Sequence, residues 1–427
     1  MAETTEAPVE NNPYTKPAYR TYVLMVLTLV YSFNFIDRQL ISILQESIKA
    51  ELLLSDTQLG LLTGFAFALF YVSAGVPIAR WADRGNRRNI ISLAVGVWSF
   101  MTAISGACMN YTQLLLARIG VGVGEAGGSP PAHSMISDIF PPESRATAMS
   151  TYSLGINIGI MFGFFLGGIL NEVLGWRWAF VLVGAPGILL AIWIRMTVAE
   201  PLRGWSEQAA VEETSVPLKD VVKRIYANLA LRNLFFASAL NSLVGYGLVN
   251  WTAPFYIRSH GMGTAELGIW LAIGAGIFGG VGTFLAGYYA DKLGKIDRRW
   301  YLLLPGIAVL AMVPFCVAFL LAENTTAALS INLIPSLLST CYIGPCLALT
   351  HGMVEPRMRA TASALYFLVI NIIGLGLGPT LIGALSDYLA PELGSESLRY
   401  AMLYIIPATA AWASLHFFIG SKHLRDK

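Results

Sequence analysis

The chain is poor in charge. Only 13% of its 427 residues are Asp, Glu, Lys or Arg, about half of the roughly 25% found in soluble domains. So few charges cannot cover a water-facing surface, which excludes an ordinary soluble protein. Apolar residues make up 55% of the chain, and this indicates an all-α, polytopic membrane protein. The net charge of +2 gives no sign of a nucleic-acid partner.

Cysteine is also scarce, and catalytic motifs are missing. The chain has no P-loop, no G-x-S-x-G, no H-E-x-x-H and no Rossmann fingerprint. We therefore expect neither an enzyme nor ATP-driven transport, and no cofactor. The N-terminus lacks the basic region of a cleaved signal peptide. Four cysteines lie in apolar runs without a C-x-x-C pair, so no disulfide framework or metal site is expected: Cys108, Cys316, Cys341 and Cys346.

Twelve apolar runs are long enough to cross a bilayer, which takes about 20 mostly apolar residues. The charge-rich stretch 200–229 separates six runs from six. We expect a tail at 1–19, a six-helix lobe at 20–199, a linker at 200–229, a second six-helix lobe at 230–420 and a tail at 421–427. The expected spans are 20–47, 58–80, 89–110, 112–138, 145–172, 177–198, 230–257, 265–290, 300–322, 328–353, 360–388 and 399–420.

The basic residues are distributed unevenly among the loops. Because Lys and Arg favour cytoplasmic loops, the distribution predicts a multi-pass protein of the cell (inner) membrane with both termini in the cytoplasm. With that orientation, few of the 28 basic residues lie in outward loops: Lys49, Arg177, Arg258 and Arg399.

The two halves carry an internal repeat. Residues 145–158 and 359–372 agree at nine of 14 positions, beginning with Arg-Ala-Thr-Ala in both. Residues 82–84, at the end of span two, are likewise matched by residues 290–292 at the end of span eight. Equivalent spans therefore run in the same direction, an arrangement that secondary transporters use. We expect a site between the lobes, lined by spans one, four, seven and ten.

At these residues the chain resembles the major facilitator superfamily. The loop after span eight follows the superfamily's G-x-x-x-D-R-x-G-R-R pattern from Gly287 to Lys295, whereas the loop after span two departs from it at Ala79 and at Gly85-Asn86. A narrower resemblance is to the spinster family of lipid transporters, with a bacterial member expected. It rests on Asn-Phe-Ile-Asp-Arg at 34–38, Ser-Asp-Thr-Gln-Leu-Gly-Leu-Leu at 55–62 and Gly-Val-Gly-Glu-Ala at 122–126. The resemblance implies the twelve-helix fold of the superfamily and proton-linked or facilitated movement of lysophospholipids or sphingosine phosphate.

Four ionisable residues fall inside expected spans: Asp37 and Arg38 in span one, Arg118 and Glu125 in span four. Such residues are costly in a bilayer and mark functional sites by default. One interpretation is that Asp37 and Glu125 bind protons during transport; the other is a buried charge network with the two arginines. Arginine keeps its charge and binds carboxylate or phosphate with paired hydrogen bonds. Arg38 and Arg118 are therefore either anion-binding residues or counter-ions only.

The remaining candidate residues are expected to bend or pack helices, to bind substrate or to form a gate. Pro130 and Pro131 predict a kink just beyond Glu125. Glycines at every fourth position of span five, from Gly155 to Gly167, predict close helix packing. Substrate binding is assigned to Arg38 and Arg118 together with Asn34, Asn241 and Tyr246. A gate on the cytoplasmic side is assigned to Asp83, Arg84, Arg87, Arg145, Asp291 and Lys292.

These observations predict a secondary, proton-coupled, alternating-access transporter that works as a monomer in the lipid bilayer. All four mid-membrane charges lie in the first lobe, and this asymmetry favours an amphiphilic anion such as a lysophospholipid or a sphingosine-phosphate-like lipid as the substrate. Two alternatives stay open. One is a proton-coupled carrier of a small organic acid, sugar or drug, and the other is a non-transporting lipid receptor or scramblase.

Overall fold

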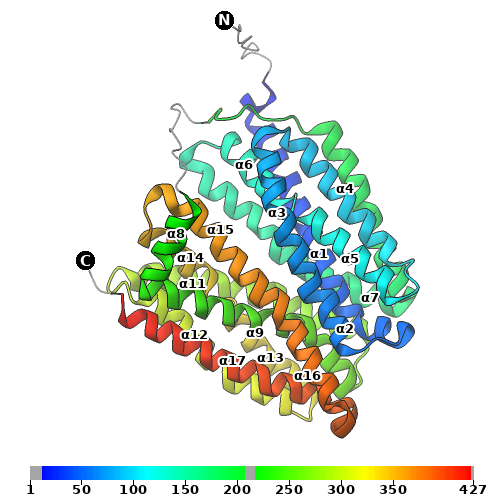
Figure 1. The fold of residues 1–427 in the computed structure, drawn as a ribbon. Helices are drawn as coiled ribbons and strands as arrows, with labels where there is room; N and C mark the ends of the chain where they lie inside the picture. The colour runs from blue at the N-terminus through cyan, green and yellow to red at the C-terminus, as the bar shows by residue number, and fades with distance from the viewer. Residues whose placement is uncertain (1–11, 207–216, 425–427) are drawn as a thin grey trace, which may run out of the picture.

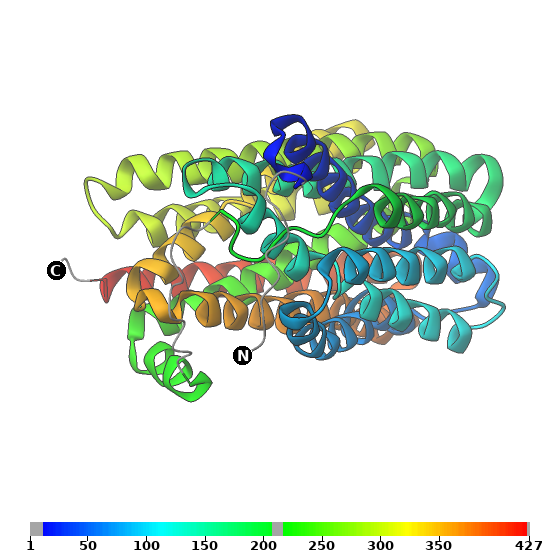
Figure 2. The ribbon, with the colours of Figure 1, turned by 90° about the horizontal axis from the view of Figure 1, so that it is seen from above.

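The structure is a computed structural model that describes residues 12–206 and 217–424. Most of the expected N-terminal tail, the middle of the linker and the last three residues lie outside the described part. Within it, helices joined by short turns build the two expected lobes (Figure 1). The spans of both lobes are roughly aligned with one common axis (Figure 2).

The first lobe contains six spans. The second of them changes to a wider π-helical turn at Leu61–Phe65, and the fourth is broken between Glu125 and Ser129, where the two prolines predicted a kink. The fifth and sixth spans form one element that divides at Gly175, which has a φ of 82° that glycine adopts without steric cost. The helices are α1 (Pro17–Leu52), α2 (Asp56–Gly60), α3 (Ala66–Arg84), α4 (Arg87–Ser105), α5 (Tyr111–Glu125), α6 (Ser129–Ile139) and α7 (Pro142–Thr197).

The second lobe repeats this plan. A short helix, α8 (Leu218–Ala227), precedes it inside the expected linker. Spans eight and eleven contain π-helical turns at Ala272–Phe278 and Ile370–Leu377, so the second span of one lobe and two spans of the other share this feature. The helices are α9 (Leu229–His260), α10 (Thr264–Leu271), α11 (Gly279–Gly294), α12 (Trp300–Leu321), α13 (Thr325–Leu338), α14 (Ile343–Met353), α15 (Arg359–Val369), α16 (Gly378–Leu393) and α17 (Ser397–Lys422).

The two ends of the molecule differ. We call the end that carries both chain termini the terminal end and the opposite end the far end. The lobes meet at the far end, where α2 and α16 lie side by side (Figure 1). A Cβ atom on Gly60 would come within 2.5 Å of the Pro379 carbonyl oxygen, and one on Gly383 within 2.3 Å of the Asp56 carbonyl oxygen. Glycine therefore permits backbone-to-backbone contact between the lobes, and the far end is closed.

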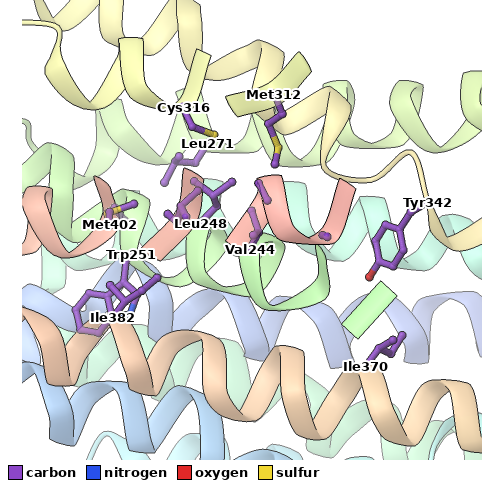
Figure 3. Packing of buried hydrophobic residues seen from close by; sticks show 14 of the residues in the cluster. Val244, Leu248, Trp251, Leu271, Met312, Cys316, Tyr342, Ile370, Ile382 and Met402 are labelled. Carbon is purple, nitrogen blue, oxygen red and sulfur yellow. The ribbon is translucent and has the colours of Figure 1, made fainter. Parts of the chain in front are cut away.

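Each lobe has a central helix in an apolar environment. In the second lobe this helix is α9, and residues from several neighbouring spans surround Val244, Leu248 and Trp251 (Figure 3). In the first lobe α1 packs closely on α7, because a Cβ on Gly159 would lie 2.4 Å from the Ser32 carbonyl oxygen. The expectation of close packing at the α7 glycines is confirmed. The rigid packing of α1 and α9 positions the polar residues that both helices carry toward the interface of the lobes.

Candidate functional site

A buried ion pair joins α1 to α5. The Arg38 Nε atom lies 2.7 Å from Glu125 Oε2, and the side chain of Glu125 is fully buried. The amide of Asn34, one helical turn before Arg38, lies beside the same carboxylate. Arg38 also lies 5.0 Å from the ring centre of Tyr71, and cations over aromatic faces are attracted by the ring quadrupole. This pair was one of the two interpretations of the mid-membrane charges.

Asp37 lies in a different environment from Arg38. Successive residues of a helix point about 100° apart, so the Asp37 side chain is directed at α4. There the hydroxyl of Thr102 donates a 3.0 Å hydrogen bond to Oδ2. Oδ1 is buried and has no hydrogen-bond partner among the described residues. Asp37 is thus a buried carboxyl group that is held by one hydroxyl.

Arg118 is the least satisfied of the four charged residues. Only 2% of it is exposed, and its Nε and Nη1 atoms have no hydrogen-bond partner within the described part of the chain. Its guanidinium lies 5.5 Å from the ring centre of Phe67. Because a buried charge without a partner is costly, an anion that reached these nitrogen atoms would be bound strongly.

The two arginines border a small cavity between the lobes. Its volume is about 30 Å³, enough for one or two water molecules. Spans one, four and seven contribute to it as expected, but spans two and eleven take the place expected for span ten, because the closed far end brings their π-helical turns together. The lining residues are Phe35, Arg38, Gln39, Ile41, Ser42, Thr63, Phe67, Arg118, Tyr246, Val249, Asn250 and Leu375.

Only some of the residues predicted to bind substrate lie at this cavity. Arg38, Arg118 and Tyr246 face the cavity, and Asn34 is behind it next to Glu125. Asn241 is buried on α9 and donates a 3.1 Å hydrogen bond to the Ser339 carbonyl oxygen. It therefore points at the break between α13 and α14, away from this cavity.

The residues predicted to form a gate lie at the terminal end. Asp83 and Arg84 are exposed at the end of α3, and Asp291 accepts a 2.8 Å hydrogen bond from the Tyr301 hydroxyl. Lys292, next to Asp291, is exposed. Arg87 is fully buried within the first lobe.

Arg87 and Arg145 make contacts within the first lobe and with the start of the linker. Arg87 pairs with Asp138 and, at 2.7 Å, with Glu200. Arg145 donates to the Ser137 carbonyl oxygen at 2.9 Å and to the Ser206 hydroxyl at 3.1 Å. These contacts hold the first residues of the linker on the first lobe.

A far-end charge cluster, which the sequence analysis did not predict, ties the lobes together. Asp56 at the start of α2 is its centre and is almost completely buried. Arg258 of α9 donates 2.7 Å hydrogen bonds to both oxygens of Asp56, and Lys49 donates one of 2.6 Å. Arg258 also pairs with Glu46 at 2.7 Å. Few basic residues were expected on the outward side, and this rarity is the signal that could have drawn attention to Lys49 and Arg258.

Asp387 of α16 adds a second connection at the same end. Its carboxylate accepts hydrogen bonds from the backbone N–H groups of Asp56 and Thr57, at 2.9 and 2.7 Å, and from the Thr57 hydroxyl. A carboxylate at a helix N-terminus satisfies free N–H groups and complements the helix dipole. A residue of one lobe thus caps a helix of the other.

Comparisons with known proteins agree with this architecture. The family model described as Major Facilitator Superfamily matches residues 27–379. The chain belongs to the major facilitator superfamily. An MFS-type efflux pump of Mycolicibacterium smegmatis is 32% identical over 400 residues, which cover 94% of this chain and 92% of the relative. A probable L-galactonate transporter of Escherichia coli is 27% identical, with 95% of this chain and 90% of the relative covered.

A solved structure gives the narrower assignment. A bacterial homologue of the human lysosomal transporter Spinster, in an inward-facing and unoccupied conformation, is 34% identical and superposes with a TM-score of 0.88. The match covers 96% of this chain and 98% of that chain. The protein is therefore a membrane transporter of the spinster type, as the motifs at 34–38, 55–62 and 122–126 predicted. It is a transporter and not an enzyme.

Proposed function

We propose that this spinster-type transporter carries an amphiphilic organic anion by proton-coupled alternating access, and that Arg118 binds the anionic head. One observation carries the proposal: Arg118 is buried beside the cavity while two of its guanidinium nitrogens have no partner within residues 12–206 and 217–424. A group that serves only as a counter-ion is paired, as Arg38 is with Glu125. Arg118 instead retains donors for a ligand.

The apolar part of the cavity wall favours an amphiphile. Ile41 of the first lobe faces Val249 and Leu375 of the second across the same small space. When the lobes separate, these side chains offer a surface on which an acyl chain is removed from water, at about 0.8 kcal/mol for each CH₂ group. The head binds to the charged lobe and the chain to the neutral one.

A small sugar acid is the second candidate. Gln39, Ser42 and Asn250 also line the cavity, and the Ser42 hydroxyl donates a 3.0 Å hydrogen bond to Asn250 Oδ1. Amides and hydroxyls of this kind recognise a polyhydroxylated substrate, and the relative from Escherichia coli is named as a probable L-galactonate transporter.

Ligand-induced stabilisation separates the two candidates. The purified protein is heated with lysophosphatidates of increasing chain length or with galactonate, because a ligand that binds the folded state raises the melting temperature. The amphiphile hypothesis predicts stabilisation that grows with chain length and is lost in Arg118→Gln. Stabilisation by galactonate together with a flat chain-length series would establish the second candidate instead.

Asp37 and Glu125 are the proposed proton carriers. Each has one carboxylate oxygen without a partner in the described part of the chain, so a proton or a water molecule can be accepted there. In this scheme the terminal end faces the cytoplasm and Asp83, Arg84, Arg87, Arg145, Asp291 and Lys292 close it when the far end opens. Uptake into proteoliposomes with and without a pH gradient tests the scheme, since a receptor or a scramblase accumulates no substrate.

A further inference from the structure

Three neighbouring stripes of side chains on the short helix α8 lie in different environments. Val221 and Ile225 are buried against α9 and α15. The residues one position further along the helix are exposed and apolar. They are Leu218, Val222 and Tyr226, whose exposed fractions are 57%, 45% and 67%. Since neighbouring residues of a helix are about 100° apart, the exposed apolar stripe lies directly beside the buried one.

Basic residues form the third stripe. Lys219 and Lys223 are exposed and lie about a further 100° around the helix, next to the apolar stripe. Arg232 at the start of α9 places its guanidinium 5.4 Å from the ring centre of Tyr226. An apolar stripe bordered by Lys and Arg is typical of helices that lie in the interface of a membrane.

The position of α8 agrees with this pattern. Only Asn228 separates it from α9, which is the seventh span of the superfamily fold, and the Asn228 side chain caps the first turn of that span. The helix therefore cannot leave the level of the bilayer surface. It protrudes at the terminal end beside α15 and runs at a steep angle to the spans (Figures 1 and 2).

We propose that α8 is a binding site for acidic phospholipids of the surrounding leaflet. Leu218, Val222 and Tyr226 insert at the level of the upper acyl chains. Lys219 and Lys223 bind the phosphate groups of the lipids above them, as long basic side chains do at an interface. The site is separate from the transport cavity and fixes the end of the linker to the membrane.

Two variants, each with one added cysteine on α8, test whether the apolar stripe inserts into the bilayer. The full-length protein with Val222→Cys or Asp220→Cys is labelled with bimane and placed in nanodiscs that contain brominated phospholipid. The native thiols give little background, because Cys108, Cys316, Cys341 and Cys346 are buried. Bromine quenching at 222 should exceed quenching at 220 several-fold, since Asp220 lies on the opposite side of the helix. Equal quenching at the two positions would overturn the proposal.

A second experiment tests the preference for acidic lipid. Phosphatidylglycerol and phosphatidylcholine compete for the purified protein, and native mass spectrometry counts the bound lipids. Lys219→Gln and Lys223→Gln should each weaken the phosphatidylglycerol preference about fivefold, as expected for one basic side chain at the surface. The control is Lys295→Gln, which removes one charge from another exposed position at the terminal end. No loss in the α8 variants, or an equal loss in the control, would refute acidic-lipid binding at α8.

Discussion

Arg118 and Arg38 are neighbours with opposite roles in stability. Arg118→Ala removes a buried charge whose Nε and Nη1 atoms have no hydrogen-bond partner among the described residues, so the unliganded protein should unfold at the same temperature or higher. Ligand binding should weaken about 10- to 100-fold, because a hydrogen bond to a charged group contributes about 1.5–3 kcal/mol. Thermal unfolding and a binding titration measure the two effects separately. Unchanged affinity would show that the anion binds elsewhere.

Arg38→Ala is the contrasting substitution. It leaves Glu125 buried without its cation, which costs about 3–5 kcal/mol of folding free energy. We expect a lower unfolding temperature that is largely restored in the double variant Arg38→Ala/Glu125→Ala, because neither charge of the pair is then left without the other. A double variant as unstable as the single one would contradict the importance of the pair.

Asp37→Asn tests proton coupling with little structural disturbance. The amide oxygen of asparagine still accepts the hydrogen bond from Thr102, but the side chain no longer titrates. Accumulation driven by a pH gradient should be lost, while exchange of labelled for unlabelled substrate at equal pH should continue. Glu125→Gln should lose both coupling and stability, since it also breaks the ion pair with Arg38. Accumulation at the normal level in Asp37→Asn would exclude Asp37 as a proton carrier.

The charged residues of the site were predictable, but their partners were not. Ionisable residues are rare in spans, so Asp37, Arg38, Arg118 and Glu125 stand out from sequence alone. Which arginine pairs with Glu125 depends on how α1 rotates against α5. The same limit applies to Asn241: its position on α9 was clear, whereas the direction of its side chain follows from packing.

Among the helices, the glycines of α7 set the distance to α1. Gly159→Ala would place a methyl group within 2.4 Å of the Ser32 carbonyl oxygen, and overpacking of this kind costs about 1–3 kcal/mol. Gly245→Ala on α9 is the matched control, because no atom lies within 4 Å of its added Cβ. We expect a lower unfolding temperature for Gly159→Ala and an unchanged unfolding temperature for Gly245→Ala. Equal melting curves would mean that α1 and α7 separate without cost.

Breaks in the helices were predictable where the amino-acid composition changes along the chain, and they were missed where it does not change. The break after Glu125 was visible because Pro130 and Pro131 cannot continue a regular helix. The π-helical turn at Leu61–Phe65 carries no such marker, since wider turns arise from the fit between neighbouring helices. Helix α8 was missed because its ten residues were counted as part of a charged linker.

At the scale of the molecule, the far-end charge cluster should determine which side is open. Arg258→Gln removes three hydrogen bonds that bind α9 to Asp56 and Glu46 of the other lobe. Spin labels at Leu53 and Tyr388, both exposed at the far end, should move apart in this variant, and double electron–electron resonance measures the distance.

Arg177→Gln is the control for that measurement. It removes an ion pair with Glu51 at the same end but within one lobe, so the distance between the labels should not change. If both variants behave like the parent protein, the glycine contacts and the Asp387 cap hold the far end closed without Arg258. The cluster escaped prediction because Arg258 lies 202 residues from Asp56 in the chain and meets it only when the lobes close.

The charges of the four buried residues have an electrical consequence. The charges of Arg38 and Glu125 cancel, so the empty site is neutral overall when Asp37 carries one negative charge and Arg118 one positive charge. A monovalent anion on Arg118 together with a proton on Asp37 again gives zero net charge. Membrane voltage acts on moving charge, at about 2.3 kcal/mol per elementary charge for each 100 mV, and here neither crossing form carries any. Transport of a monoanion would therefore follow the pH gradient but ignore a potassium diffusion potential, whereas a dianion would make the same protein electrogenic.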